Sequence, residues 1–284
     1  MIAVTGANGQ LGRLVIEGLL EVVPAAQIVA GVRNLDNSGD LRALGVQVRE
    51  ADYDRPETLA AAFEGVEKLL LISAVIPGER VRQHTAAIDA ARQAGVKLIA
   101  YTSILRADTS TLGLAAEHLA TEAYLQDSGL DYVLLRNGWY LENTAAAIAP
   151  ALANGALIGT AGVGRFASAT RADYAGAAVA VLTRPGHANR TYELAGDHAF
   201  TMTEFAEEVS KQARRPIVYN DLSSSEYEAV LLGLGLPKMI VDVVIDSDVK
   251  ARNGELASNS RDLSRLLGRP TTPVSEAVRT ALQA

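Results

Sequence analysis

The sequence of 284 residues contains no cysteine. This absence excludes disulfide bonds, zinc–thiolate sites and thiol chemistry, and we predict no metal site. The sequence also lacks an apolar run long enough to cross a membrane. It has no basic segment leading into a hydrophobic stretch at its start, so we predict no signal peptide and expect the protein in the cytoplasm.

Positive charge is also scarce. The 26 Lys and Arg residues are outnumbered by 33 Asp and Glu residues, which gives a formal net charge of -7. Because non-specific binding to nucleic acid needs basic side chains that neutralise phosphates, this balance argues against nucleic acid as a partner. It leaves room for a local basic pocket that holds one small anion. A hydrophobic content of 49% at this length is typical of one large domain, or of a main domain with a small companion.

Three of the 24 glycines, by contrast, lie close together near the start of the chain. Residues 4–12 read VTGANGQLG, after a short apolar run and before an amphipathic stretch. Gly6 allows a sharp turn, Gly9 lets backbone N–H groups approach a pyrophosphate, and Gly12 lets a helix lie close to the strand. The helix N-terminus adds unpaired N–H groups and partial positive charge. An ordinary tight turn is the alternative, but the strand–turn–helix context favours a nucleotide site.

A second strand is predicted over residues 27–32 and ends at Arg33-Asn34. In a dinucleotide-binding fold this position lies beside the adenosine ribose. An acidic residue there holds the 2′-hydroxyl of NAD, whereas an Arg accommodates the 2′-phosphate of NADP. Guanidinium–phosphate hydrogen bonds are charge-assisted and often bidentate. Arg33 therefore predicts NADP(H) as the cofactor, against the alternative of a solvated surface Arg.

Strand and helix patterns alternate along the chain up to about residue 200, which predicts an α/β fold of the Rossmann type with a doubly wound parallel sheet. We expect an NADP-binding domain over 1–140, with 168–198 returning to it. A smaller, mostly helical substrate-binding region is expected over 199–284 together with 141–167. The further strands are predicted at 46–50, 68–73, 96–102, 130–136 and 192–195.

Two local signals predict helix starts. Asp54 followed by Pro56 reads as a cap with an early proline, and Thr201 followed by Glu204 reads as a capping box. Asp52 follows the third strand and has two interpretations of equal weight. It accepts from an adenine amino group, or it caps a turn.

The helix expected over 112–128 lacks a pair that short-chain dehydrogenases usually carry there. Those enzymes place Tyr-x-x-x-Lys on one helix face, where the Lys lowers the pKa of the Tyr. Here Leu114 and His118 occupy the two positions, so we do not expect tyrosine-based proton transfer in its usual form. His118 could orient ribose hydroxyls or shuttle a proton. A partly exposed helix histidine is the plainer alternative, and we expect Glu117 and Glu122 to face solvent.

The sixth predicted strand runs into residues 136–143, which read RNGWYLEN and hold the single Trp of the chain. Asn side chains there can bond a nicotinamide, and aromatic rings can wall a flat substrate. A packed loop in which Trp139 fills the junction between domains is the alternative. Further along, Arg171 pairs with Asp173 or reaches the cofactor phosphates.

Taken together, these motifs resemble the NmrA-like branch of the atypical short-chain dehydrogenases. The resemblance covers nearly the whole chain and looks very close to the bacterial NADPH:quinone oxidoreductases of type 2. Triphenylmethane dye reductases share the glycine turn and the Arg-Asn pair. That branch also lacks the Tyr-x-x-x-Lys pair. The most specific segments are 5–12, 32–34, 68–73, 99–103, 135–143 and 167–174.

The resemblance implies an NADPH-dependent reductase that transfers hydride to a quinone-type acceptor. The alternatives are an NmrA-like regulatory protein that senses NADP(H), and a reductase of another flat conjugated electrophile such as a triphenylmethane dye. A homodimer is one assembly open to the chain. The implied cofactor-binding residues are Gly6, Ala7, Asn8, Gly9, Gln10, Leu11, Arg33, Ser73, Ala74, Val75, Asn137, Gly138, Trp139, Tyr140, Leu141, Glu142 and Arg171.

The missing Tyr–Lys pair fits catalysis on an activated acceptor. A quinone is already a strong electrophile, so it needs little general-acid help. We expect water, Tyr140, Asn143 or His118 to steady the developing oxyanion. Positioning against an apolar, aromatic wall supplies much of the remaining effect.

Overall fold

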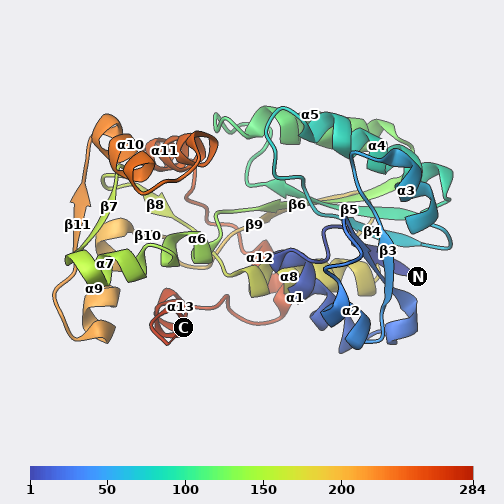
Figure 1. Ribbon diagram of the computed structural model, residues 1–284, viewed down its shortest axis with the longest axis horizontal. Coiled ribbons are helices and arrows are strands. Elements are labelled where there is room, and N and C mark those ends of the chain that lie inside the picture. Colours follow the sequence, from blue (N-terminus) through green and yellow to red (C-terminus); the bar gives the residue numbers. More distant parts are fainter. Residues whose placement is uncertain (284) are drawn as a thin grey trace.

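The computed structural model, which describes residues 1–283, is built around a seven-stranded parallel sheet (Figure 1). The strand order is β3-β2-β1-β4-β5-β6-β9, so the direction of winding reverses between β1 and β4. Doubly wound sheets bind ligands at this switch point. The Rossmann-type fold is therefore confirmed. The strands are β1 (Ile2–Val4), β2 (Ile28–Val32), β3 (Gln47–Glu50), β4 (Lys68–Leu71), β5 (Leu98–Ile104), β6 (Asp131–Asn137) and β9 (Arg190–Leu194).

The central strands are apolar along their length because both faces of the sheet are covered. In β4, successive side chains enter different cores. Leu70 packs in the core beneath α1 (Gln10–Leu20), whereas Leu69 and Leu71 pack in the core beneath α4 (Arg80–Gln93). All three leucines are buried. The three consecutive leucines of β4 therefore reflect a strand that is covered on both faces.

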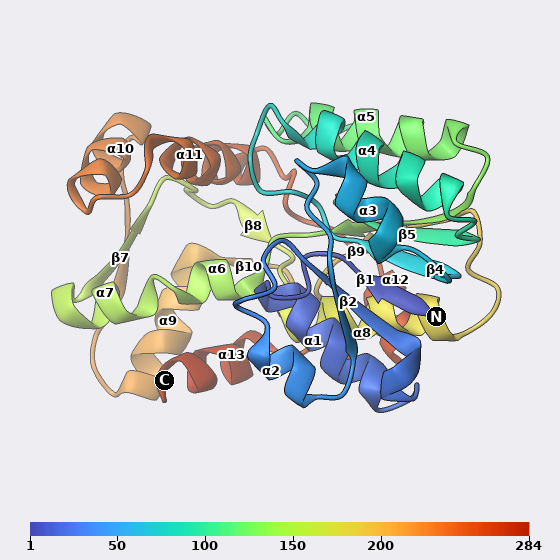
Figure 2. The same ribbon diagram turned by 45° about the vertical axis from the view of Figure 1, so that its right-hand side comes forward.

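Helices form a layer on each face of the sheet (Figures 1 and 2). α1, α2 and α8 cover one face, and α3, α4 and α5 cover the other. The predicted amphipathic stripe of α1 is confirmed, since Leu11, Val15, Ile16 and Leu19 are buried. The bounds are α1 (Gln10–Leu20), a 3-10 turn (Ala25–Gln27), α2 (Gly39–Ala43), α3 (Pro56–Ala62), α4 (Arg80–Gln93), α5 (Ala115–Asp127) and α8 (Arg171–Thr183).

The smaller region contains two short two-stranded sheets and a separate core. β7 (Ala156–Gly159) pairs in parallel with β11 (Val218–Asp221), and β8 (Arg165–Phe166) pairs antiparallel with β10 (Phe200–Thr201). The rings of Phe166, Phe200 and Phe205 lie together in this core. Its helices are α6 (Leu141–Ala145), α7 (Ile148–Asn154), α9 (Met202–Ala213), α10 (Ser224–Gly233), α11 (Lys238–Arg252) and α13 (Val274–Ala281).

One helix departs from the expected division of the chain. α12 (Asp262–Leu267) packs against α8, and Leu263 and Leu266 belong to the core of the large region. The expectation that 199–284 belongs wholly to the smaller region is therefore wrong for α12. The rest of that division remains a proposal.

The chain passes repeatedly between the two regions, and hydrogen bonds join the connecting segments. The Gly138 N–H donates to the Leu194 carbonyl at 2.8 Å, and the Gly196 N–H donates to the Ala167 carbonyl at 2.8 Å. A Cβ on Gly196 would lie 2.1 Å from the Ser168 carbonyl oxygen. The two segments therefore lie backbone against backbone.

Both predicted helix starts are confirmed, since α3 begins at Pro56 and α9 at Met202, but only one of the two predicted caps is present. The capping box is confirmed, because the Thr201 hydroxyl accepts from the Glu204 N–H and the Glu204 carboxylate accepts from the Thr201 N–H. The predicted Asp54 cap is wrong. Arg55 occupies the N-cap position of α3, and its side chain makes no capping hydrogen bond. The Asp54 carboxylate instead accepts from Arg82 and Gln83 of α4. No helix within residues 1–283 is long and apolar enough to cross a membrane.

Candidate cofactor and acceptor site

The glycine turn after β1 has the close contacts that the motif predicts. Gly6 has a φ of +60°, a region that favours glycine. A Cβ on Gly12 would lie 2.4 Å from the Gly6 carbonyl oxygen, and a Cβ on Gly9 would lie 3.1 Å from it. Glycine at position 12 therefore lets α1 begin directly against the turn.

The N-terminus of α1 carries backbone donors without partners in the helix. Gly9 is the N-cap residue and provides no side-chain hydrogen bond. The first N–H groups of an α-helix have no acceptor within the helix. No acidic side chain lies in the first turn either. Such an end is suited to a phosphate.

A cavity of about 550 Å³ lies beside this helix end, at the carboxyl ends of β1, β2, β3 and β4. Its volume falls in the range of small-molecule sites. The predicted cofactor residues that line it are Gly6, Asn8, Gly9, Arg33, Ser73, Ala74 and Val75. Further lining residues are Arg13, Val32, Asn34, Asn37, Ala51, Asp52, Tyr53, Asp54, Ile72, Ile76 and Gln83.

Three predicted cofactor residues of the turn do not line this cavity. Ala7 is buried and donates its N–H to the Gly31 carbonyl at 3.1 Å, so that donor is already used. The Leu11 side chain is buried in the core beneath α1. Gln10 is exposed at the helix start. Any role of Leu11 toward a cofactor therefore falls to its backbone N–H group.

Two arginines face the cavity from neighbouring elements. Arg33 follows β2, is exposed, and forms no ion pair with any residue of the described chain. Arg13 lies in the first turn of α1 and pairs with Asp40 at 3.3 Å. Sequence reasoning missed Arg13. Its signal was a cation in the first turn of a helix, where the helix dipole disfavours positive charge unless an anion binds nearby.

The cavity is also lined by buried polar atoms that lack partners. The Asn8 amide donates to the Ser38 hydroxyl at 3.1 Å, but its Oδ1 has no donor within the described residues. The Gln83 amide donates to Asp54 at 2.9 Å, and its Oε1 likewise has none. Buried acceptors of this kind usually bind a donor. The residues around the cavity therefore fit a ligand with phosphates and hydroxyl or amino groups.

Asp52 has the turn-capping role that was one of its two interpretations. Its Oδ1 accepts from the Asp54 N–H at 3.1 Å, and its Oδ2 accepts from Arg55 at 3.3 Å. The residue also lines the cavity. The neighbouring Tyr53 hydroxyl lies 2.6 Å from Thr5 Oγ1 and 2.8 Å from the Ile72 carbonyl, which ties the ends of β1 and β4 together.

His118 does not lie in the cavity, which corrects its placement on the substrate side. The side chain is buried beneath α5, and its Nδ1 lies 2.7 Å from the Tyr101 hydroxyl. Burial, and then the positive charge of Arg80, lowers the pKa of His118 to about 3. The expectation of a partly exposed helix histidine is also wrong.

The two glutamates of α5 also face inward. Glu122 is buried and forms a bidentate pair with Arg136, at 3.0 and 2.7 Å. Glu117 pairs with the buried Arg80 at 2.9 Å. The expectation that both glutamates face solvent is therefore wrong. The inner face of α5 carries polar side chains because strands and helices from elsewhere in the chain supply their partners.

A second group of predicted residues gathers around Arg171, where α8 begins. The guanidinium donates to Asn143 Oδ1 at 2.7 Å and lies 4.9 Å from the centre of the Tyr140 ring. Its backbone N–H donates to Glu142 at 2.8 Å. The predicted local pair with Asp173 is wrong, because the Asp173 carboxylate instead pairs with Arg269 and accepts from Thr272.

This group does not line the cavity at the switch point, but it holds buried polar atoms of its own. Asn137 donates to the Tyr140 hydroxyl at 3.4 Å, and its Oδ1 has no partner in residues 1–283. The buried hydroxyls of Ser168 and Tyr174 also have none. Trp139 is half-buried and packs against the core of the smaller region.

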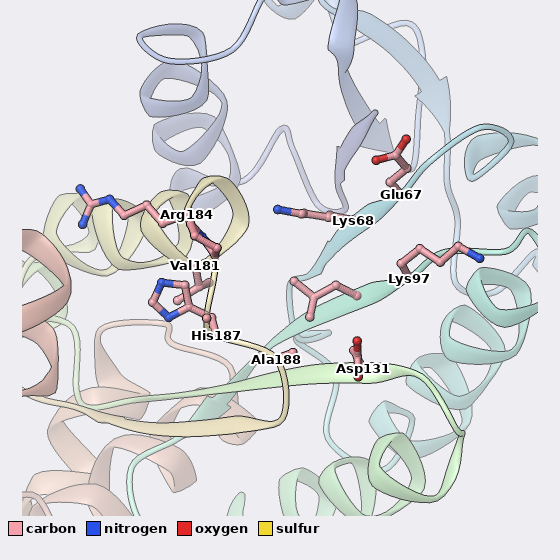
Figure 3. A pocket seen from close by; sticks show the side chains of 11 residues that line it. Glu67, Lys68, Lys97, Asp131, Val181, Arg184, His187 and Ala188 are labelled. Carbon is pink, nitrogen blue, oxygen red and sulfur yellow. The ribbon is translucent and has the colours of Figure 1, made fainter.

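A second hollow of about 240 Å³ lies at the opposite edge of the sheet (Figure 3). Lys68, Leu98 and Asp131 line it where β4, β5 and β6 begin. Parallel sheets bind ligands at the carboxyl ends of their strands. The Lys68 ammonium already donates to the Leu182 carbonyl at 2.6 Å. This hollow therefore adds no functional site.

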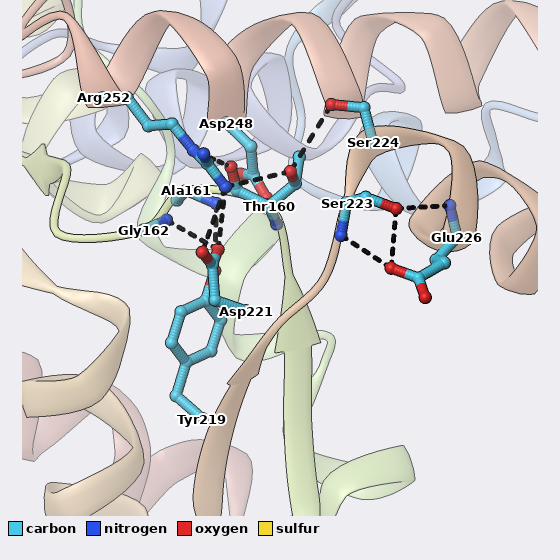
Figure 4. Close-up of polar contacts among 10 residues, drawn as sticks. All are labelled: Thr160, Ala161, Gly162, Tyr219, Asp221, Ser223, Ser224, Glu226, Asp248 and Arg252. Carbon is cyan, nitrogen blue, oxygen red and sulfur yellow. Dashed lines mark hydrogen bonds and ion pairs between the residues drawn. The ribbon is translucent and has the colours of Figure 1, made fainter.

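A polar network fixes the loop after β7 in the smaller region (Figure 4). Three successive N–H groups of residues 160–162 donate to Asp248, to the Tyr219 hydroxyl and to Asp221, at 2.9, 2.9 and 2.8 Å. Arg252 joins the Thr160 carbonyl to Asp221. Because its donors are satisfied by side chains of the chain itself, the loop is structural.

Comparison with known proteins places this geometry among nucleotide-binding enzymes. A profile of the NAD(P)H-binding family matches residues 6–185. Quinone oxidoreductase 2 of Escherichia coli (strain K12) is 53% identical over 278 residues, which cover 98% of this chain and 97% of that protein.

Solved structures agree. The crystal structure of an NADPH-dependent quinone oxidoreductase from Escherichia coli, complexed with NADPH, has a TM-score of 0.96 and 52% identity over 99% of this chain and all of that one. Citrobacter sp. triphenylmethane reductase, complexed with NADP(H), has a TM-score of 0.96 and 39% identity, covering 99% of this chain and 100% of that one.

Proposed function

Because this chain belongs to the NAD(P)H-binding family, we propose that it is an NADPH-dependent reductase that transfers a hydride to a quinone-type acceptor. Its similarity to quinone oxidoreductase 2 of Escherichia coli over nearly the full length supports the acceptor class. The single observation that carries the cofactor assignment is the convergence of the glycine turn, the uncapped start of α1 and Arg33 on one cavity.

On the cofactor side, the free N–H groups at the start of α1 would bind the diphosphate. Arg33, with Arg13 lining the same cavity, would bind the 2′-phosphate, because a guanidinium pairs well with phosphate. The loop of Ser73, Ala74 and Val75 would line the cofactor. When bound, NADPH supplies the hydride. The protein's contribution is to bind, orient and exclude water.

On the acceptor side, we assign Tyr140 and Asn143, with Asn137 as a neighbour. Burial raises the pKa of Tyr140, so its phenol stays protonated at neutral pH and can donate a hydrogen bond to a developing oxyanion. The Asn143 carbonyl is held by Arg171, which leaves the amide nitrogen to donate. We also propose that residues 137–142 and Arg171 lie next to the bound cofactor. His118 is dropped because it is buried elsewhere.

A direct test mixes the protein with NADPH and a panel of quinones and cationic triphenylmethane dyes, and follows the absorbance of the reduced nicotinamide. We expect turnover with quinones, and slower turnover with the Tyr140→Phe variant. Turnover with dyes alone would favour the dye reductase, for which the Citrobacter enzyme is the precedent. Tight binding of NADPH with no turnover would favour an NADP(H) sensor.

We also propose the cytoplasm as the location, since the cytoplasm supplies NADPH, and a homodimer as the assembly. Sedimentation of the purified protein with and without NADPH tests the assembly. A single species of monomer mass at all concentrations would contradict the dimer.

A further inference from the structure

The loop between β4 and α4 forms one wall of the cavity. Ser73, Ala74, Val75 and Ile76 all line it. Val75 is 78% exposed and Ile76 is 46% exposed. Large apolar side chains at the edge of a polar cavity gain most when a ligand covers them. The shape of this loop therefore matters for whatever the cavity binds.

One buried histidine holds the backbone of this loop. The Ala74 N–H donates to Nε2 of His84, which lies on α4, at 2.8 Å. The His84 Nδ1 lies 3.0 Å from the Thr121 hydroxyl oxygen on α5, and that hydroxyl donates to the Glu117 carbonyl at 2.9 Å. His84 is fully buried.

The direction of these bonds fixes the tautomer of the ring. A backbone N–H can only donate, so Nε2 of His84 must be an unprotonated acceptor. The Thr121 hydroxyl gives its proton to the Glu117 carbonyl, so it accepts from Nδ1 of His84. Each proton in this series of hydrogen bonds is therefore assigned to one atom, and the His84 ring is neutral. Burial, and then the charge of Arg80, lowers the pKa of His84 to about 4, in agreement with this assignment.

The carbonyl group of Ala74 is held by a hydrogen bond as well. Arg80 Nε donates to the Ala74 carbonyl at 2.7 Å. Arg80 pairs with Glu117 at 2.9 Å, and the other oxygen of Glu117 accepts from the Gly78 N–H at 2.8 Å. Both peptide groups of Ala74 and the end of the loop are therefore attached to α4 and α5.

We propose that His84 is a positioning residue: as a neutral hydrogen-bond acceptor it fixes the backbone of Ala74, and with it the loop that faces the cofactor. This inference rests on the proposed NADPH site. When a loop is ordered before the ligand binds, binding does not have to offset the entropy lost by ordering it. Loss of the acceptor leaves a half-buried N–H without a partner, so the loop rearranges toward water.

The test compares two substitutions at one position. His84→Leu keeps an apolar volume but has no acceptor, whereas His84→Gln restores an acceptor. We expect His84→Leu to raise the Kd for NADPH on the order of tenfold, as the loss of one hydrogen bond implies, and His84→Gln to recover most of the affinity. Tyr101→Phe, which removes the hydroxyl bonded to His118 in the same core, is the control and should leave the Kd unchanged.

Two measurements need no cofactor. Amide hydrogen exchange of Ala74 should be faster in His84→Leu than in the wild type and in His84→Gln. Nitrogen-15 spectra of the wild-type imidazole should show Nε2 unprotonated. A wild-type Kd in His84→Leu, an equal loss in His84→Gln, or a protonated Nε2 would overturn the proposal. If the wild type itself binds no NADPH, the proposed function fails, while Ala74 exchange still decides whether His84 holds the loop.

Discussion

Gly12 has no room for a side chain, and this makes it a sharp test of the turn. In Gly12→Ala the new Cβ would meet the Gly6 carbonyl oxygen at 2.4 Å, a backbone atom that moves only if the turn moves. We expect a loss of about 1–3 kcal/mol in the free energy of unfolding, together with weaker NADPH binding. Urea denaturation and calorimetry measure the two effects.

Gly39→Ala is the matched control for that substitution. Gly39 begins α2, and a Cβ there would meet nothing within 4 Å. It should change the stability by no more than about 1 kcal/mol, in the stabilising direction. Equal losses for the two glycines would contradict the proposed role of close packing at the turn.

Arg33 decides between the two nicotinamide cofactors. Arg33→Ala should raise the Kd for NADPH by roughly ten- to a hundredfold, the equivalent of one charge-assisted hydrogen bond, and leave the Kd for NADH nearly unchanged. Titration of each cofactor by calorimetry measures the difference. Arg215→Ala removes the same charge from an exposed position beyond α9 and should affect neither. Equal losses of NADPH and NADH binding would remove the argument for a 2′-phosphate contact.

At this scale the sequence predicted what depends on local chemistry. Gly6, Gly9 and Arg33 lie beside the cavity because a turn and the residue after a strand are set by their immediate neighbours. Gln83 was missed, because it reaches the cavity from the middle of α4 and its role depends on a partner, Asp54, far away in the sequence.

Among the elements, α5 is the one whose role the sequence misjudged. In dehydrogenases with a Tyr-x-x-x-Lys pair this helix carries the chemistry. Here Glu117, His118, Thr121 and Glu122 all turn inward, and their partners come from α4, β5 and β6. A polar helix face normally predicts exposure to solvent. It failed here because buried partners satisfy the polar groups, and no periodicity in α5 itself reveals them.

The pair of Glu122 with Arg136 gives a test of that interpretation. Glu122→Gln should lower the free energy of unfolding on the order of 3 kcal/mol, because it leaves a buried guanidinium with less compensating charge. Arg136 keeps Glu193 as a partner at 2.8 Å, so the loss should lie at the lower end for buried pairs. Glu21→Gln, at the exposed end of α1, should cost no more than about 0.5 kcal/mol. Similar losses for both would mean that burial of Glu122 contributes little.

For the whole molecule, buried titratable groups predict how stability depends on pH. Burial lowers the pKa of His84 from 6.5 to about 4 and that of His118 from 6.5 to about 3. Between these values the unfolded chain binds more protons than the folded chain, so the stability falls as the pH falls below about 6.5. Asp248 acts in the opposite direction, because burial raises its pKa from 3.8 to about 6. Its contribution is lost as the pH rises through about 6.

The two histidines outweigh the one aspartate, so we expect a net loss of stability between about pH 7 and about pH 5. Urea denaturation at the two values measures it. His118→Gln should make the loss smaller, and Asp248→Asn should make it larger. A loss that His118→Gln leaves unaltered would mean that this histidine is not buried in its neutral form.

The order of elements in the large region was predictable because its central strands carry apolar runs, as in β4, and α1 carries an apolar stripe. The place of α12 was not. Leu263 and Leu266 form a short apolar pair that would suit either core, and only the return of the chain to α8 decides between them. Assignments of this kind depend on distant contacts that a local pattern does not contain.

The hydrogen-bonded segments that connect the two regions restrict how the regions can move relative to each other. The segments near Gly138, Ala167 and Gly196 are hydrogen-bonded to one another or to β9, and α12 brings the chain back a further time. A hinge motion needs only one or two flexible connections between regions. Here, bending would have to break the backbone hydrogen bonds of several connecting segments at once. Entry and exit of small molecules should therefore depend on side chains and on exposed loops such as that of Val75 and Ile76, while the two regions keep their mutual orientation.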